Sequence, residues 1–216
     1  MRREMIAATG NREKMVEIRQ ILAGSDIDLV TMKDAGLDLD IVENGETFEE
    51  NALIKARAVA AASGKMAIAD DSGLVVDAMG GEPGVHSARW MGHDTSYDIK
   101  NREIIRLVDE YCEKEETRTL RHPGCEADGT PGPLRSARFV CAVAVVWPDG
   151  KERVVKGVLE GRINTRQCGK NGFGYDPIFY LPEYGKTSGE ILREEKNRIS
   201  HRGQAFRKIR AILEEA

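Results

Sequence analysis

The chain has 216 residues, of which 41% are hydrophobic, and this is sufficient for one sizeable domain or two smaller lobes. Charged residues make up 31% of the chain, but both signs are mixed and the formal net charge is only −4. This balance argues against a general nucleic-acid-binding or membrane-binding surface, because such a surface needs a strong basic excess.

No segment of the sequence predicts export or membrane insertion. The apolar run near the N-terminus is too short for a signal peptide, and no stretch approaches the length of a membrane span. The four cysteines form no CxxC pair, which is typical of a reduced protein with free thiols. His122 and Cys125 have the spacing of half a zinc site, but no second half accompanies them. We therefore expect a cytoplasmic enzyme or binding protein without zinc.

The first elements predicted are a strand and a helix. Met5–Ala8 is a short apolar run typical of a strand, and it ends at a polar turn. Residues 12–22 then carry apolar side chains at helical spacing, with Gly24 as the expected C-terminal cap.

A second helix and two short strands follow. Thr47 and Glu50 have the spacing of a capping box, which predicts a helix over residues 48–63. Met66–Ala69 and Leu74–Ala78 predict two buried strands, with a break between them at the sequence DDSG.

The middle of the chain predicts a long loop and a helix. Residues 79–95 are rich in glycine, which is typical of an ordered loop. Ile99–Tyr111 has apolar residues along one helical side. Residues 112–135 combine charges, prolines and glycines with little to bury, so they predict a flexible surface insertion.

The C-terminal part predicts a hairpin, a loop with another strand, and a final helix. Residues 136–147 form an apolar run, the turn Pro148–Gly150 follows, and residues 151–161 return as the partner strand. The glycine- and aromatic-rich sequence CGKNGFGYDPIFYLP leads into another strand. From Ser200 the spacing indicates a helix with its apolar side inward. Interleaved helices and strands favour a mixed α/β fold.

The first candidate site is the sequence TGNREK, between the first strand and helix. A helix N-terminus presents unpaired N–H groups and a partial positive charge, which suit an anion. Gly10 allows close approach, Asn11 suits capping or contact, and Lys14 can neutralise a phosphate. The spacing is not that of a Walker A loop. An ordinary capped helix is the alternative.

The second candidate is a group of acids. Glu46, Glu49 and Glu50 lie near a helix N-terminus, where they are ordinary complements of the helix dipole. The adjacent Asp70 and Asp71 are costly to desolvate without a partner, and a hard divalent cation such as magnesium would explain them. A solvated turn is the alternative.

Two further candidates lie in the C-terminal part. In GFGYDP, glycines clear space beside Phe173 and Tyr175, which suits stacking of a planar base, and Asp176 can accept hydrogen bonds from ring N–H groups. A tight turn with core aromatics is the alternative. In REEKNRISHRGQA, His201 and Arg202 stand at a helix start, where cations are disfavoured, although a surface charge run is the usual interpretation.

The chain resembles the Ham1/ITPase family of noncanonical purine nucleoside triphosphate pyrophosphatases in five motifs that follow the family's order: ATGNREK, ETFEENALIKA, ADDSGLVVDAMGGEPGVHSARW, GFGYDPIF and SHRGQA. The resemblance covers essentially the whole chain. It implies one ITPase-like domain over residues 1–216, with an elongated twisted mixed sheet flanked by helices and two lobes about a central cleft. The segment 112–135 is longer than expected for the family.

The resemblance also implies an activity. Members hydrolyse ITP, dITP and XTP to the monophosphate and pyrophosphate with magnesium (Mg²⁺) as cofactor, and thereby cleanse the nucleotide pool. A cytoplasmic homodimer is implied, with no nucleic acid polymer or membrane as partner.

Each motif receives a role by this resemblance. Asp71 would be the catalytic proton acceptor, and Glu43 and Asp71 would hold Mg²⁺. Ser87 and Arg89 also fall in a family motif. The residues expected to bind the substrate are Thr9, Gly10, Asn11, Arg12, Glu13, Lys14, Lys55, Ser72, Phe173, Gly174, Tyr175, Asp176, Lys196, His201 and Arg202.

Three other functions compete with this one. A Maf-type nucleotide pyrophosphatase would act on pyrimidine or modified nucleotides. A nucleotide-binding module without turnover would not need a candidate base beside a metal site. A structural or scaffold protein leaves the paired acids and the aromatic loop unexplained.

Overall fold

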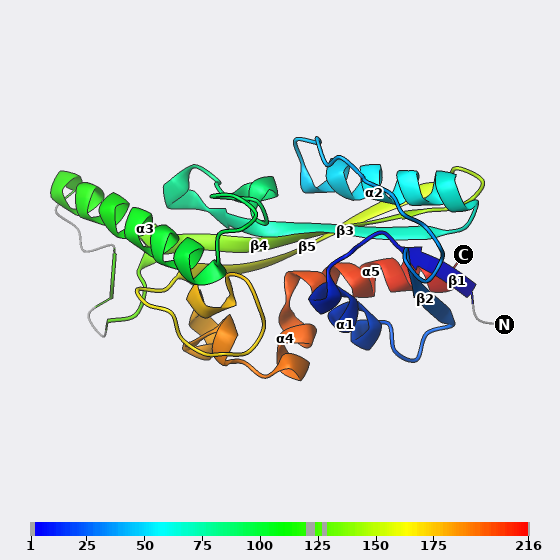
Figure 1. Cartoon of the computed structure of the whole chain (residues 1–216). Helices are drawn as coiled ribbons and strands as arrows, with labels where there is room; N and C mark the ends of the chain where they lie inside the picture. The colour runs from blue at the N-terminus through cyan, green and yellow to red at the C-terminus, as the bar shows by residue number, and fades with distance from the viewer. Residues whose placement is uncertain (1–2, 120–123, 127–128, 216) are drawn as a thin grey trace. The chain divides into compact units, whose positions relative to one another are not determined.

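The computed structural model describes residues 3–119, 124–126 and 129–215. Its strands form a seven-stranded mixed sheet of order β2-β1-β3-β4-β5-β6-β7, with helices packed against it (Figure 1). The strands are β1 Arg3–Ala7, β2 Ile27–Thr31, β3 Ala67–Val76, β4 Ser136–Val146, β5 Glu152–Ile163, β6 Phe179–Leu181 and β7 Lys186–Thr187. The helices are α1 Arg12–Ile21, α2 Phe48–Ser63, α3 Tyr97–Thr119, α4 Arg193–Ile199 and α5 His201–Glu215. The predicted mixed α/β class is confirmed.

The chain divides into two compact units. Unit 1 contains the described residues up to Ser72, Val140–Val158 and the described residues from Asn197 onward. Unit 2 contains Gly73–Phe139 and Leu159–Lys196. The strands β3, β4 and β5 therefore each contribute residues to both units.

The core of unit 1 lies between the sheet and the helices α1 and α5. Strand β1 pairs in parallel with β2 and with β3, and Figure 1 shows α1 and α5 on one face of these strands and α2 on the other. The buried cluster on the α1 and α5 face comprises Met5, Ala7, Met15, Ile18, Leu22, Ile27, Met66, Ile68, Cys141, Val143, Val145, Ala205, Phe206, Ile209 and Leu213. The predicted inward side of the last helix is thereby confirmed.

Strand β3 is continuous where the sequence predicts two strands. It runs from Ala67 to Val76, and Asp70 and Asp71 lie in its middle, so the predicted break at DDSG is wrong. The physical reason is charge compensation: cationic side chains from other elements reach both carboxylates, as described below, and a charged residue with such a partner can stay in a buried strand.

The helix ends of unit 1 follow local signals. Thr47 and Glu50 form the predicted capping box, and α2 ends at Gly64 in the left-handed conformation. Helix α1 ends earlier than expected: its C-cap is Leu22, and Gly24 follows two residues later with a φ of 81°. Strand β2 was not predicted from the sequence, and its side chains beyond Ile27 are exposed or only partly buried.

Helix α3 of unit 2 is longer than predicted. It begins at Tyr97 and continues through Cys112 to Thr119, where the sequence predicts a surface insertion. Good helix formers such as glutamate and lysine continue the helix there although apolar spacing has ended. The insertion itself stays a prediction, because residues 120–123 and 127–128 lie outside the described residues, as does His122 of the zinc pattern.

The far end of this segment is held by a buried arginine. Arg135, in the turn Pro133–Arg135, donates from Nε to the carbonyl oxygen of Ile163 at 2.7 Å and pairs with Asp109 of α3 at 2.6 Å. This contact joins α3 to the end of β5 within unit 2.

Among the residues that the structure describes, no helix has the length and apolar character needed to cross a membrane.

The predicted hairpin and the predicted strand after the aromatic loop are present. The turn between β4 and β5 is closed by a hydrogen bond from the Trp147 N–H to the Lys151 carbonyl oxygen at 2.9 Å. Strand β6 pairs antiparallel with both β5 and β7. The short helix α4 was not predicted as a separate element.

Gly157 of β5 marks a close approach to α5, which generates a prediction. A Cβ added at Gly157 would lie 2.1 Å from the carbonyl oxygen of His201 and 2.8 Å from the backbone nitrogen of Ala205. Because helix backbone cannot swing aside, we expect Gly157→Ala to lower the free energy of unfolding by about 1–3 kcal/mol in urea denaturation. Gly10→Ala, where the added Cβ meets nothing within 4 Å, is the control. Equal stability of Gly157→Ala and the wild type would contradict this packing.

Candidate active site

Asp70 and Asp71 are adjacent in β3 but their carboxylates meet cations from different helices. Asp70 Oδ2 lies 3.0 Å from Lys14 Nζ of α1 and 3.5 Å from Arg202 Nε of α5. Asp71 Oδ1 lies 3.5 Å from Lys55 Nζ of α2. Successive strand residues point to opposite faces of a sheet, and α2 lies on the face opposite α1 and α5 (Figure 1). Each acid therefore has its own counter-ion, and the two tolerate adjacency.

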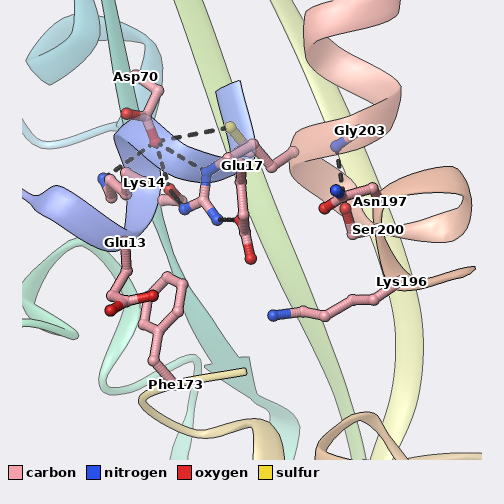
Figure 2. A network of polar contacts seen from close by, with 12 residues as sticks. Glu13, Lys14, Glu17, Asp70, Phe173, Lys196, Asn197, Ser200 and Gly203 are labelled. Carbon is pink, nitrogen blue, oxygen red and sulfur yellow. Dashed lines mark hydrogen bonds and ion pairs between the residues drawn. The ribbon is translucent and has the colours of Figure 1, made fainter. Parts of the chain in front are cut away.

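On the Asp70 side, the polar side chains are linked to one another in a network of contacts. Ser72 Oγ donates to Asp70 Oδ2 at 2.8 Å, and Arg202 Nη2 donates to Ser72 Oγ at 2.9 Å. Arg202 also donates from Nη1 to Oε2 of the buried Glu17. Figure 2 shows Asp70 at the centre of these contacts, with Lys14 and Glu17 beside it. Two cations thus balance two carboxylates on this face.

These charges keep Asp70 ionised. Burial alone would raise the pKa of its carboxyl group, but Lys14, Arg202 and Lys55 outweigh burial and lower that pKa well below the ordinary value. Burial and the Asp70 charge raise the pKa of the neighbouring Cys141 thiol to about 12. Asp70 is therefore a permanent anion and Cys141 a neutral thiol.

The Asp71 side is less completely compensated. Lys55 Nζ lies 2.8 Å from Oε2 of Glu43 and 3.5 Å from Asp71 Oδ1, so one ammonium serves two carboxylates. Burial, with the charges of Glu43 and Asp70 adding to it, raises the pKa of Asp71 despite Lys55 and Lys14. The pKa of Asp71 thus moves in the direction opposite to that of Asp70.

The segment that carries Glu43 is tied to α2 by a residue that the sequence analysis missed. Asn51 is buried, accepts from the Gly45 N–H at 2.8 Å and donates to the Gly45 carbonyl oxygen at 3.3 Å. Asn51 lies in the motif ETFEENALIKA, and an amide in the buried half of a predicted helix is the signal that would have found it. Lys55 follows one helical turn later. Helix α2 therefore carries both the amide that holds Gly45 and the ammonium that contacts Glu43.

Glu43 and Asp71 fit a magnesium ion better than a metal that needs several protein ligands. Asp70 Oδ1 and Asp71 Oδ2 are buried without a hydrogen-bond partner among the described residues. A buried carboxylate oxygen without a partner is costly, and a hard cation satisfies it. Within residues 3–119, 124–126 and 129–215, no three His, Cys, Asp or Glu side chains form a metal-binding group. Magnesium needs only one or two carboxylates, with waters and phosphates completing its shell.

The TGNREK segment forms a capped helix N-terminus. Asn11 Oδ1 accepts from the N–H groups of Glu13 and Lys14 at 3.0 and 3.1 Å, and Thr9 Oγ1 accepts from the Asn11 N–H at 3.2 Å. The space beside Gly10 is open, and Arg12 is exposed. The capped-helix interpretation is confirmed, and anion binding stays a prediction.

Ser200 immediately precedes helix α5, and its side chain binds the first turn of that helix. Its Oγ accepts from the Gly203 N–H at 3.0 Å, as Figure 2 shows. His201 and Arg202 are both buried in the first turn of α5. The described contacts of the Arg202 guanidinium are with carboxylates and a hydroxyl of unit 1, and its predicted contact with a base stays a prediction.

In unit 2, Asp176 organises the aromatic loop. Asp176 Oδ2 accepts from the Phe173 N–H and from Lys196 Nζ, both at 2.7 Å, and Oδ1 accepts from Ser188 Oγ at 2.9 Å. The Lys196 ammonium lies 5.1 Å from the centre of the Phe173 ring. Gly172 has a φ of 77°, and a Cβ there would lie 2.1 Å from Asp176 Oδ2. The loop is therefore folded around a buried ion pair, and Phe173 is its half-buried ring.

Tyr175 fixes the same loop through contacts with other residues of unit 2. Its hydroxyl donates to the Ser87 carbonyl oxygen at 2.8 Å, and its ring meets Tyr97 edge-on with centroids 5.1 Å apart. Asn101 of α3 donates to the Gly174 carbonyl oxygen at 3.2 Å. Tyr175 is thus a core aromatic, which is the alternative the sequence left open. Asn101, which the sequence analysis missed, is buried and polar on a predicted helix.

The side chain of Ser87 holds the backbone near the end of β3, whereas the side chain of Arg89 contacts a different residue. Ser87 Oγ accepts from the Leu74 N–H at 2.9 Å and donates to the Gly84 carbonyl oxygen at 2.6 Å. The Arg89 guanidinium contacts His86 Nδ1 at 2.9 Å on the surface. The predicted site residues thus divide between the units. Ser87, Arg89, Phe173, Gly174, Tyr175, Asp176 and Lys196 belong to unit 2, and the others belong to unit 1.

The Arg202 network generates a prediction on stability. Arg202→Ala would leave two buried carboxylates without this counter-ion, so we expect the free energy of unfolding to fall by about 3–5 kcal/mol. Arg57→Ala is the matched control, because it breaks the exposed Arg57–Glu152 pair and should cost about 1 kcal/mol or less. Urea denaturation of both variants measures the difference. Similar losses in the two variants would contradict the role of Arg202 as a buried counter-ion.

The sequence and the fold match proteins of one family. Residues 5–212 match the model of the Ham1 family. The chain is 43% identical to a dITP/XTP pyrophosphatase of Symbiobacterium thermophilum over 99% of this chain and 98% of that protein. A dITP/XTP pyrophosphatase of Bacillus licheniformis is 40% identical over 99% of this chain and 100% of that protein. The structure of a HAM1 protein from Coxiella burnetii matches with a TM-score of 0.83 and 35% identity, over 99% of this chain and 100% of that one. The chain therefore belongs to the Ham1 family.

Proposed function

We propose that this protein is a nucleoside-triphosphate pyrophosphatase that hydrolyses ITP, dITP and XTP to the monophosphate and pyrophosphate. The observation that carries the proposal is the buried Asp71 carboxylate, which has an unpartnered oxygen among the described residues and stands beside Lys55 and Glu43. Relatives that cover the whole chain bear the name dITP/XTP pyrophosphatase and support the same activity. The role would be removal of deaminated purine nucleotides from the cytoplasmic pool, by a homodimer.

The proposed cofactor is Mg²⁺, held by Glu43 and Asp71. When bound, the ion would neutralise charge on the triphosphate and on the leaving pyrophosphate. The two carboxylates are a ligand set of the size that magnesium accepts. Lys55 and Lys14 would add positive charge for the phosphate chain, and the open N-terminus of α1 beside Gly10 would add backbone N–H groups.

The chemistry assigned to the chain is positioning and proton transfer. Water attacks the α-phosphorus, the new P–O bond forms as the bond to the pyrophosphate oxygen breaks, and Asp71 accepts the proton of the water. Such transfers depend mostly on alignment and charge neutralisation. Without an ion, burial raises the pKa of the Asp71 carboxyl group above its ordinary value.

Base selection follows from hydrogen-bond complementarity. Hypoxanthine and xanthine carry a 6-oxo acceptor and an N1–H donor, and adenine reverses both. We assign donation to the 6-oxo group to His201 and Arg202, and stacking to the half-buried ring of Phe173 under Lys196. Each buried polar group left unpaired by ATP costs about 1–3 kcal/mol, so two mismatches suffice for strong discrimination.

Asp71→Asn tests the assigned proton acceptor. Asparagine keeps the size of the side chain but accepts no proton, so we expect kcat for ITP to fall at least ~100-fold, as for loss of a general base. Pyrophosphate release measures kcat, and the far-ultraviolet circular dichroism should stay that of the wild type. Near-normal turnover by Asp71→Asn would refute the assignment.

A substrate screen tests the function itself. With Mg²⁺ present, pyrophosphate release should be fast for ITP, dITP and XTP and slow for ATP, dTTP and UTP, because only the first group matches the proposed donors. Excess EDTA should abolish release. Preference for dTTP or UTP would instead indicate a Maf-type enzyme, and tight ITP binding without turnover in Mg²⁺ would indicate a binding module.

A further inference from the structure

Lys55 occupies the place between the two proposed magnesium ligands. Its ammonium nitrogen lies 2.8 Å from Glu43 Oε2 and 3.5 Å from Asp71 Oδ1. The lysine is 8% exposed, so this contact is largely shielded from water. An ammonium in this position does part of what a divalent ion would do, because it neutralises charge and holds both carboxylates together.

The compensation at this place is incomplete. One ammonium is shared by two carboxylates, and Asp71 Oδ2 is buried without a hydrogen-bond partner among the described residues. On the other face of β3, Lys14 and Arg202 balance the formal charges of Asp70 and Glu17, although Asp70 Oδ1 is also buried without a hydrogen-bond partner among the described residues. The remaining attraction for a cation therefore lies on the Lys55 side.

We propose that Lys55 is an internal counter-ion that exchanges partners: it leaves Glu43 and Asp71 when the divalent ion binds and then pairs with the triphosphate. The inference rests on the proposed function, because it uses the assigned ion and substrate. Its consequence is that the ion and the triphosphate bind with positive coupling.

The sign of the charge gives the reason for this coupling. Before the ion binds, the set of Glu43, Asp71 and Lys55 is negative and repels a polyanion. A divalent ion changes the formal charge of the same set to one positive unit, which attracts it. By linkage, the triphosphate must then raise the affinity for the ion by the same factor. The ion adds the same two positive units with or without the lysine, so the part of the coupling that depends on Lys55 comes from the ammonium that the ion releases for the triphosphate.

Metal binding without nucleotide is the first test. The affinity for Mn²⁺ is measured by electron paramagnetic resonance at pH 8 in the wild type, Lys55→Gln and Lys55→Arg. We expect Lys55→Gln to bind Mn²⁺ at least about fivefold more tightly than the wild type, because a competing cation is gone. Lys55→Arg keeps the charge and should stay near the wild type. Lys65→Gln removes the exposed Lys65–Glu4 pair and is the matched control.

The direction in which the Mn²⁺ affinity changes distinguishes the proposed partner exchange of Lys55 from simple disruption of the site. A lesion that only loosens the site would weaken Mn²⁺ binding, whereas exchange predicts that the variant binds it more tightly. Equal or weaker Mn²⁺ binding by Lys55→Gln would overturn the proposal. The proposed function would survive that result if the wild type still cleaves ITP with Mg²⁺, and it would fail as well if the wild type neither bound Mn²⁺ nor cleaved ITP.

Coupling in the wild type is the second test and does not depend on a variant. The Mn²⁺ affinity is measured with and without α,β-methylene-ITP, which cannot be cleaved at the reacting bond, after correction for Mn²⁺ bound by free nucleotide. We expect the analogue to raise the affinity at least about fivefold in the wild type and by a clearly smaller factor in Lys55→Gln, in which the ion releases no ammonium to pair with the triphosphate. Independent binding of ion and analogue to the wild type would overturn the exchange.

Discussion

The alternation of side chains along β3 is the constraint on which the site depends. Because neighbouring strand residues face opposite sides of the sheet, Asp70 and Asp71 meet Lys14 and Lys55 separately. A shift of one residue in this strand would exchange the two carboxylates between α1 and α2. The buried residues around them, such as Ile68 on the α1 and α5 face, fix the register. The hydrophobic core thus determines which acid meets which helix.

The same alternation gives two identical side chains different chemistry. Asp70 has several cations and a hydroxyl on one oxygen, and its pKa is lowered despite burial. Asp71 pairs with Lys55, which it shares with Glu43, and the pKa of Asp71 is raised. Environments that push the pKa values of paired acids apart are typical of acid–base sites. Asp70 therefore organises the network, and Asp71 is the carboxylate left available for chemistry.

Sequence patterns predicted the features that depend on nearby residues. The capping box of Thr47 and Glu50, the β4–β5 hairpin and the buried side of α5 are all encoded within a few residues. The continuity of β3 was not predictable in this way, because the charge that allows Asp70 into a strand comes from Lys14 and Arg202, far away in the sequence. Glu17 was missed for the same reason, because its partner Arg202 is far away in the sequence.

Motif resemblance identified residues of the site but not the partners that those residues have in the fold. Asp176 was expected to accept from a base, and its described contacts instead hold Phe173, Ser188 and Lys196 in place. A buried carboxylate paired with a lysine thus organises the loop of unit 2, as Asp70 with Lys14 organises unit 1. In both cases the acid fixes the geometry and the cation is carried by a helix. Asp71 differs because its lysine is shared with a second acid, and an ammonium that serves two carboxylates can be replaced by a cation of higher charge. The ammonium that two carboxylates share therefore lies where the proposed reaction needs an ion.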